Sequence, residues 1–186
     1  MHGGKVKGSR IPAAMACCWF VFAVAACSVC AQTKGAWETA QSPRAFVEGF
    51  YRWYVPVAQK VDGMTHSDFA IQHKGRAFSS ELRQLLKEDS EAQAKCSDII
   101  GIDMDPFLIS GDEESYEVGK IAKEGGNFRA EIYGVRSGKR LATPVLIAEF
   151  SGAGGHWFFV NFHYPNGTDL LMALKEPRPM CSMPVH

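Results

Sequence analysis

The sequence lacks the short motifs that mark most nucleotide-binding, hydrolytic and metal-binding chains. No Gly-x-Ser-x-Gly elbow, phosphate-binding loop or dinucleotide fingerprint occurs, and the stretch SGAGG follows an expected strand but opens no helix. The histidines show neither His-x-x-His nor Glu-x-x-His spacing, which a zinc site on a helix would need. We therefore predict no cofactor and no metal ion, and we favour a protein without enzyme activity.

An excess of positive charge is also absent. The chain has 20 basic and 20 acidic residues, and its first 31 residues hold three of the basic ones and no acidic one. Without that segment, 17 basic residues face 20 acidic ones. A chain that follows a phosphate backbone needs a basic stripe, so we predict no nucleic-acid partner.

Residues 1–31 have the features of a signal peptide. Three basic residues precede an apolar run from Ile11 to Ala31, and the run is too interrupted to favour an uncleaved membrane anchor. Val29 and Ala31 are the small residues expected before a cut at Gln32. The chain is therefore expected to be exported to the periplasm or secreted.

A second cleavage pattern overlaps the first. The stretch VAAC, from Val24 to Cys27, fits the loose pattern of a bacterial lipobox, in which Cys27 would be acylated and become the mature N-terminus. The alternative location is thus the outer membrane as a lipoprotein, and the membrane would then be a partner only through this lipid anchor. No second long apolar run follows.

Cysteine is scarce after the leader. Only Cys96 and Cys181 remain once the first 31 residues are removed. An even pair in an exported domain predicts a disulfide, which would stabilise the fold by about 2–4 kcal/mol.

The first part of the remaining chain has helical periodicity. Ser42 and Pro43 are typical of a helix start. An aromatic stripe follows at helical spacing: Phe46, Phe50, Trp53 and Val57. Pro56 is expected to kink or end this helix. HSDFAIQHK predicts a short second helix, and Ser79 or Ser80 caps a third.

The later part of the chain changes to a period of two. We expect strands at Tyr116–Ala122, Phe128–Val135, Leu141–Phe150 and Trp157–Tyr164. The glycine-containing stretches KEGGN, RSGKR and SGAGG between them predict short hairpin turns and hence an antiparallel meander. Thr168 is expected to cap a short C-terminal helix.

Together these elements predict an α+β fold, with N-terminal helices packed on a curled four-stranded antiparallel sheet and a short C-terminal helix. We assign residues 32–41 to a linker, 42–176 to a single domain and 177–186 to a C-terminal tail. A helix across the concave face of such a sheet would enclose a cone-shaped cavity. Its candidate ligand-binding residues are aromatic: Phe50, Tyr54, Trp157 and Phe159.

Four stretches resemble a bacterial family of exported proteins, the domain of unknown function 3828: FVEGFYRWYV, SSELRQLLKEDSEAQAK, IIGIDMDPFLISGDE and VNFHYPNGTDLLMALKE. The resemblance spans about residues 44–175. It implies the cone-shaped fold of the nuclear-transport-factor-2-like and cystatin-like kind, and a place in the periplasm or at the outer membrane. It implies no catalytic residues.

The stretch GIDMDPFLISGDEE gathers five carboxylates. The stretch does not fit the pattern of an EF-hand calcium-binding loop, because Pro106 and Phe107 occupy the positions where that loop needs a ligand and a sharp glycine turn. A general base is the second hypothesis, with Asp103 or Asp105 assisted by a tyrosine or histidine in the cone; the assisting candidates are Tyr51, Tyr54 and His163. A loop with five acids is expected to be solvated, which disfavours this hypothesis.

A structural role is the interpretation that we prefer for this stretch. The residue before a proline is pushed out of helical geometry, so Asp105 should end the helical part. Asp103 and Asp105 would accept backbone amides in Asx-turns while Phe107 and Leu108 enter the core.

Three function hypotheses agree with these patterns. The first is a non-enzymatic envelope protein that binds a partner protein or a small apolar ligand. The second is a small-molecule isomerase or hydrolase that uses a carboxylate in the cone, and the third is a periplasmic immunity protein.

Overall fold

The structure, a computed structural model, describes residues 42–96, 101–109 and 112–177. The chain divides into the units 1–34 and 35–186, and every described residue belongs to the second. The predicted signal peptide, the linker, Cys27, Cys181 and residues 178–186 of the tail lie outside the described residues. The Cys96–Cys181 disulfide therefore stays a prediction; Cys96 itself is buried.

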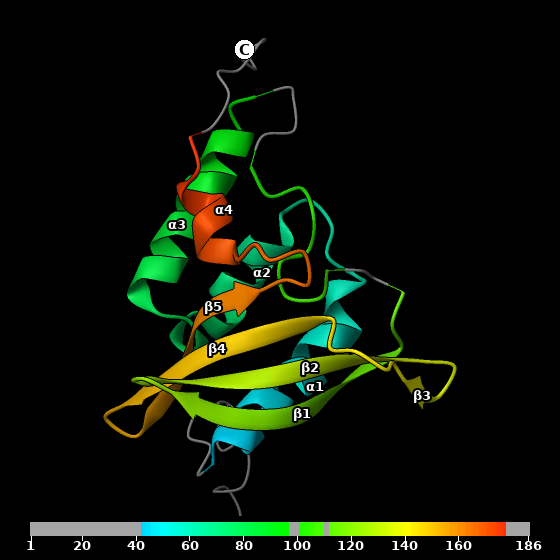
Figure 1. The fold of residues 1–186 in the computed structure, drawn as a ribbon. Helices are drawn as coiled ribbons and strands as arrows, with labels where there is room; N and C mark the ends of the chain where they lie inside the picture. Colours follow the sequence, from blue (N-terminus) through cyan, green and yellow to red (C-terminus); the bar gives the residue numbers. More distant parts are fainter. Residues whose placement is uncertain (1–41, 97–100, 110–111, 178–186) are drawn as a thin grey trace, which may run out of the picture. The chain divides into compact units, whose positions relative to one another are not determined.

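The described elements are, in chain order, α1 (Pro43–Ala58), α2 (His66–Lys74), the 3-10 turn η1 (Gly75–Ala77), α3 (Ser80–Gln93), β1 (Ser115–Glu124), β2 (Asn127–Arg136), β3 (Lys139–Arg140), β4 (Leu146–Ala153), β5 (His156–His163) and α4 (Leu170–Lys175). The sheet is antiparallel in the order β1-β2-β4-β5, with β3 paired to the end of β2 (Figure 1). Helices followed by a curled antiparallel sheet confirm the predicted α+β class.

Local sequence signals place the helix starts. Ser42 accepts a hydrogen bond from Ala45 N at 3.2 Å, and Pro43 occupies the first turn, as predicted. Ser79 caps α3 in the same way, through Leu82 N at 3.1 Å. α1 does not end at Pro56 but continues to Ala58, and Pro56 stands in its last turn.

The cap of α4 was predicted one residue too early. Asp169 is the N-cap, and its carboxylate accepts a hydrogen bond from Met172 N at 2.8 Å. Thr168 instead turns its hydroxyl toward Asn166, to whose Oδ1 it donates at 2.7 Å. The Asp169 carboxylate caps the helix in preference to the Thr168 hydroxyl because it carries a full negative charge at the positive end of the helix.

Glycine turns join the strands as the sequence predicts. Gly125 between β1 and β2, Gly138 after β2, and Gly154 and Gly155 between β4 and β5 have positive φ angles between 59° and 82°. This left-handed geometry matches the right-handed twist of the paired strands. Each of the four expected regions thus contains a strand, in the predicted order, and the short β3 is a fifth strand that was not predicted.

The third expected strand, Leu141–Phe150, starts later than predicted, because β4 begins only at Leu146. The two-residue strand β3 (Lys139–Arg140) lies before the predicted start. Pro144 lies between β3 and β4 and has no backbone N–H to donate to a neighbouring strand. Pairing with β2 resumes directly after it, where Val145 N donates to Ile132 O at 2.8 Å.

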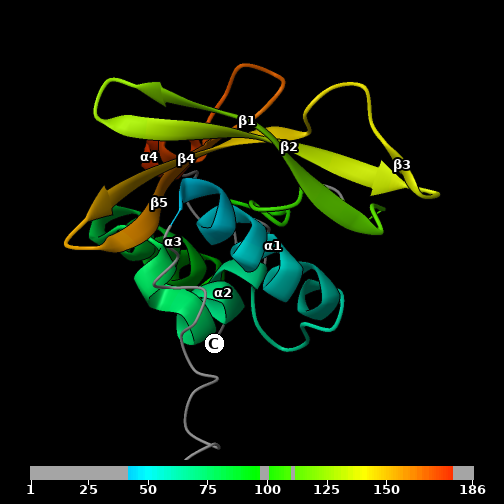
Figure 2. The same cartoon turned by 90° about the horizontal axis from the view of Figure 1, so that it is seen from below.

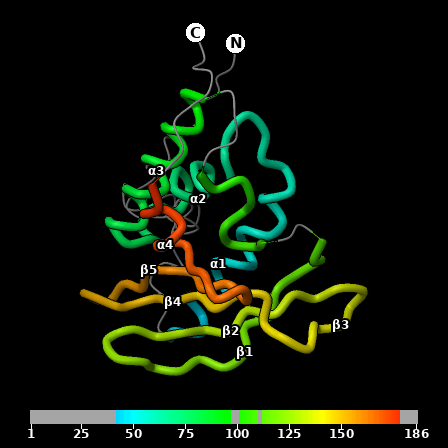
Figure 3. The backbone as a smooth tube through the Cα atoms, turned by 45° about the horizontal axis from the view of Figure 1, so that its top comes forward, coloured from blue at the N-terminus to red at the C-terminus, as the bar shows by residue number. Residues whose placement is uncertain are grey.

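The core lies between α1 and one face of the sheet (Figure 2). Phe46 contacts the rings of Phe150 and Phe159 on the sheet, with centroids 5.8 and 4.7 Å apart. Phe50 lies 4.9 Å from Phe159 and 5.8 Å from Phe107. α2 and α3 lie together toward the β5 edge, and β1 forms the opposite edge (Figure 3).

Candidate functional site

The structure brings Asp105 and Tyr54 together, as the general-base hypothesis required. Tyr54 Oη donates to Asp105 Oδ2 at 2.9 Å, and Phe107 N donates to Asp105 Oδ1 at 2.9 Å. The second bond is the predicted Asx-turn. Burial raises the pKa of the Asp105 carboxyl, and the bonds from Phe107 and Tyr54, with His66 nearby, offset only part of that effect. The expectation of a solvated carboxylate was therefore wrong for Asp105.

Three further tyrosines hold the residues that follow Asp105. Tyr164 Oη donates to the carbonyl oxygen of Pro106 at 3.2 Å, and Tyr51 Oη to that of Phe107 at 3.3 Å. Tyr116 Oη lies 3.0 Å from both Leu108 O and Glu113 Oε2. We call these residues the tyrosine cluster: Tyr51, Tyr54, Tyr116 and Tyr164. Burial is the main cause that raises the pKa of each of these phenols.

This arrangement fixes residues 105–108 as a structural anchor. The side chain of Phe107 is fully buried and Leu108 is nearly so, as predicted. Both oxygens of the Asp105 carboxylate already have hydrogen-bond partners. Asp103 does not join them: it is exposed and lines a separate pocket of about 240 Å³ with His66 and Met104. The two carboxylates of the Asp-Met-Asp stretch thus lie in different surroundings, with Asp105 in the anchor and Asp103 at the surface.

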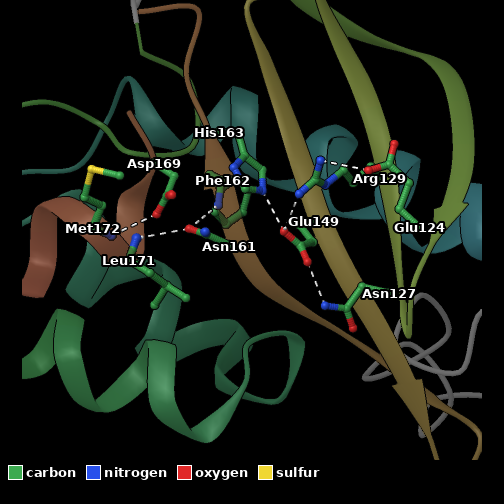
Figure 4. Close-up of polar contacts among 10 residues, drawn as sticks. All are labelled: Glu124, Asn127, Arg129, Glu149, Asn161, Phe162, His163, Asp169, Leu171 and Met172. Carbon is green, nitrogen blue, oxygen red and sulfur yellow. Dashed lines mark hydrogen bonds and ion pairs between the residues drawn. The ribbon is translucent and has the colours of Figure 1, made fainter. Parts of the chain in front are cut away.

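His163 does not approach Asp105 but belongs to a polar network on the other face of the sheet (Figure 4). Its Nε2 lies 2.6 Å from Glu149 Oε2, and Asn127 Nδ2 donates to Glu149 Oε1 at 2.7 Å. Arg129 adds a longer ion pair, with 3.7 Å between its NH2 and Glu149 Oε2. Burial alone would raise the pKa of Glu149, but the bonds from Asn127 and His163 and the charge of Arg129 lower it.

The same view shows how α4 is attached to the sheet. Asn161 Oδ1 accepts hydrogen bonds from Phe162 N at 2.9 Å and from Leu171 N at 3.0 Å (Figure 4). Asn161 is buried, so its amide oxygen takes the place of a water molecule for the first turn of α4. The contacts of Glu149 with Asn127, Arg129 and His163 thus connect β2, β4 and β5.

Replacing Glu149 by glutamine is expected to destabilise the domain by roughly 1–2 kcal/mol at neutral pH, because a charged acceptor of two hydrogen bonds is lost. The folded-state pKa is lowered, so this stability is present above the unfolded pKa of about 4.3 and disappears as the pH falls through the folded one. Urea unfolding of both proteins between pH 7 and pH 3 measures it. Glu91→Gln, at an exposed site on α3, is the control. If the wild-type protein and Glu149→Gln differ in free energy of unfolding as much at pH 3 as at pH 7, the electrostatic explanation is contradicted.

The candidate ligand-binding aromatics fill the core instead of lining a cavity. Phe50, Tyr54 and Phe159 have no exposed surface. Phe50 stacks on Tyr54 at 5.2 Å and contacts Phe159 at 4.9 Å. Trp157 is partly buried and lies edge-on to Phe128, with centroids 5.3 Å apart. The prediction of an apolar ligand site at these residues was therefore wrong, because their rings pack against one another.

An open groove lies outside the core, between α1 and β1. It has a volume of about 590 Å³, and we call it the α1–β1 groove after its lining residues: Glu48, Tyr51, Arg52, Val55, Pro56, Glu114, Ser115, Tyr116, Glu117 and Val118. β1 is an edge strand of the sheet. Nothing in the sequence pattern pointed to this groove, since it depends on how far α1 lies from the edge of the sheet.

Arg44 closes one end of the exposed β1 edge. Its NH1 donates to Val118 O at 2.7 Å, and its NH2 donates to Gly119 O at 2.6 Å. These carbonyls lie where the pairing of β1 with β2 shifts register, between Val118 and Ile121. The start of α1 is thereby tied to the bulge in β1, and the edge beyond it, toward Ser115, borders the groove.

Two further features bear on function. Within residues 42–96, 101–109 and 112–177, no group of three or more histidine, cysteine or acidic residues is arranged to hold a metal ion. In the same ranges, no helix has the length and apolar character that crossing a membrane requires.

Comparisons with known proteins give little. No family model matches the chain, and no curated protein does. A SEC-C motif containing protein from Rhodopseudomonas palustris is similar in structure, with a TM-score of 0.35 and 15% sequence identity over 66% of this chain and 78% of that one. A likeness at this level assigns neither a fold family nor a function.

Proposed function

We propose that the chain is an exported, non-enzymatic envelope protein that binds a partner protein through the α1–β1 groove. The proposal includes the cone-shaped fold of the nuclear-transport-factor-2-like kind and membership of the domain of unknown function 3828 family. The stretches quoted in the sequence analysis support the family. A periplasmic location, or a lipid anchor at the outer membrane, accompanies it.

The groove is the observation that carries the proposal. Its walls combine apolar surface from Pro56 and Val118 with the exposed charges of Arg52 and Glu117. An apolar centre with charged margins is typical of protein-binding surfaces. The neighbouring edge strand offers backbone groups to an extended segment of a partner. A groove of this form suits a strand-like peptide segment better than a compact small molecule.

The competing functions have weaker support. A small apolar ligand would need space among the core aromatics, whose rings contact one another. An isomerase or hydrolase would need an accessible carboxylate beside an assisting tyrosine or histidine. Both oxygens of Asp105 are engaged, and the exposed Asp103 lines a separate pocket that contains none of the assisting candidates. An immunity protein is a special case of the proposal, in which the partner is a toxin.

Site-specific photo-crosslinking in the producing cells tests the groove. A photoreactive residue in place of Glu117, exposed on the groove wall, should give one adduct of defined mass that contains a partner chain. Pro56→Arg in the same protein should reduce this adduct by about tenfold or more, because it places an unpaired charge and added bulk in the apolar part of the groove.

The matched controls use the exposed Gln72 of α2. A photoreactive residue at Gln72 should give no such adduct, and Gln72→Arg should leave the Glu117 adduct unchanged. Equal adduct yields from the Glu117 and Gln72 positions, or an adduct that Pro56→Arg does not reduce, would refute binding in the groove.

A further inference from the structure

A second open pocket lies where α3 begins, next to β5. Its volume is about 480 Å³, and we call it the α3 pocket after its lining residues: Arg76, Phe78, Ser79, Ser80, Arg83, His156 and Phe158. It shares no lining residue with the α1–β1 groove. A ligand in the α3 pocket would therefore occupy a site distinct from that of the proposed partner protein.

The walls of the α3 pocket are held in place by the sheet. Ser79 N donates to the carbonyl oxygen of Phe159 at 2.8 Å, and Phe78 forms a parallel bridge with Phe159. Phe78 is buried, and its ring lies 5.2 Å from that of Phe107. Phe78 and Ser79, which lie between Arg76 and Arg83 in the chain, are thus fixed to β5 and to the core.

The charges in the pocket are of one sign. Arg76 and Arg83 make no ion pair or side-chain hydrogen bond with any other residue that the structure describes. No carboxylate is among the lining residues. In contrast, Arg44, Arg129 and Arg136 all have acidic partners. The pocket thus holds uncompensated positive charge in a concave surface.

Both arginine side chains line the pocket, and that of Arg83 lies beside Gly75, the residue before Arg76. A Cβ placed on Gly75 would lie 3.7 Å from Arg83 Cδ and 3.9 Å from Arg83 NH1, which is an ordinary van der Waals distance. Two guanidinium groups on the same surface repel each other unless an anion lies between them. Guanidinium groups also match the oxygens of a phosphate in a bidentate way, which lysine does not.

From this geometry we propose that the α3 pocket binds the phosphate group of a small organic phosphate. Arg76 and Arg83 contact the phosphate oxygens, and the exposed hydroxyl of Ser80 adds a hydrogen-bond donor. Phe158, which is half-buried in the pocket wall, packs against the organic part. The ligand class is thus a phosphate monoester with an apolar or aromatic substituent.

Titration of the full-length protein with phenyl phosphate, followed by calorimetry and by amide chemical shifts, tests the proposal. We expect a dissociation constant of about 1 mM or below, with shifts at Arg76, Ser80 and Arg83. Replacing both arginines by glutamine (R76Q with R83Q) should weaken binding by about tenfold or more, because charge-assisted hydrogen bonds are lost. Phe158→Ala should weaken phenyl phosphate but leave inorganic phosphate unchanged.

The matched control removes two exposed positive charges elsewhere in the domain, Lys60 and Lys139, as K60Q with K139Q. It should leave the affinity within twofold of the original. An equal loss in both double variants would reveal a general charge effect and refute the pocket. Absence of shifts at the pocket residues, with phenyl phosphate at ten times the expected dissociation constant, would refute it as well. Benzyl alcohol should not bind; equal affinity for it would show that the phosphate is not what is recognised.

Discussion

Phe107→Ala is expected to destabilise the domain by about 3–5 kcal/mol, the range measured for removing a fully buried phenylalanine. The ring has no exposed surface and contacts Phe50, Tyr54, Phe78 and Phe162 at centroid distances between 5.1 and 5.8 Å. Its loss leaves a cavity that these rings cannot fill, because each is held by other partners. Urea unfolding followed by circular dichroism measures the change in the free energy of unfolding.

Met104→Ala is the matched control, because Met104 lies three residues before Phe107 and is 49% exposed. It should change the free energy of unfolding by less than about 0.5 kcal/mol. A loss below about 1 kcal/mol for Phe107→Ala would show that residues 105–108 are not anchored in the core. In that case the Asp-Pro-Phe stretch would again be available for a functional role.

Asp105→Asn is expected to stabilise the domain at neutral pH. The folded-state pKa of Asp105 is raised by burial. A raised carboxyl pKa means that the folded state binds more protons than the unfolded state, so stability falls as the pH rises from about 3.9 toward the folded pKa. Asparagine removes this loss and can still accept the hydrogen bond from Phe107 N. We therefore expect the free energy of unfolding of Asp105→Asn to exceed that of the wild-type protein at neutral pH.

Two observations check this cause. The difference between the wild-type protein and Asp105→Asn should vanish near pH 3, where the carboxyl is neutral in both states. Asp105→Ala should instead destabilise the domain by about 1–3 kcal/mol, because it removes the Asx-turn and leaves Tyr54 Oη without its acceptor. Unfolding by guanidinium chloride at pH 3, 5 and 7.5 separates the cases. A stability of Asp105→Asn below that of the wild-type protein at pH 7.5 would contradict the burial argument.

The features that the sequence predicted well are determined by neighbouring residues. Ser42 and Pro43 start a helix through bonds within one turn, and Gly125 and Gly154 shape hairpins through their own φ angles. The Asx-turn at Asp105 needs only Phe107 N, two residues on. These contacts form at short sequence separation, so a pattern of residue types is enough to predict them.

The features that the sequence did not predict depend on distant contacts. Burial of Asp105 requires Tyr54, 51 residues earlier, and could not be foreseen in a stretch with five acidic residues. The aromatic stripe of α1 has the same periodicity whether it lines a cavity or packs solidly. Only the distances between Phe50 and its neighbours on β5 distinguish the two cases. The open pockets are set by the spacing of whole elements and have no signature in the residue order.

The tyrosine cluster has a consequence for how the protein responds to strong base. Four of the protein's five tyrosines hold residues 105–108, and burial raises the pKa of each of those four. Ionisation of these phenols is disfavoured while the segment stays in place, because a phenolate would leave water for a buried site and lose its role as a donor. The ultraviolet absorbance of these four phenolates should therefore appear together with release of the Asp-Pro-Phe segment. For the tyrosine cluster, we expect ionisation and local opening to be one event.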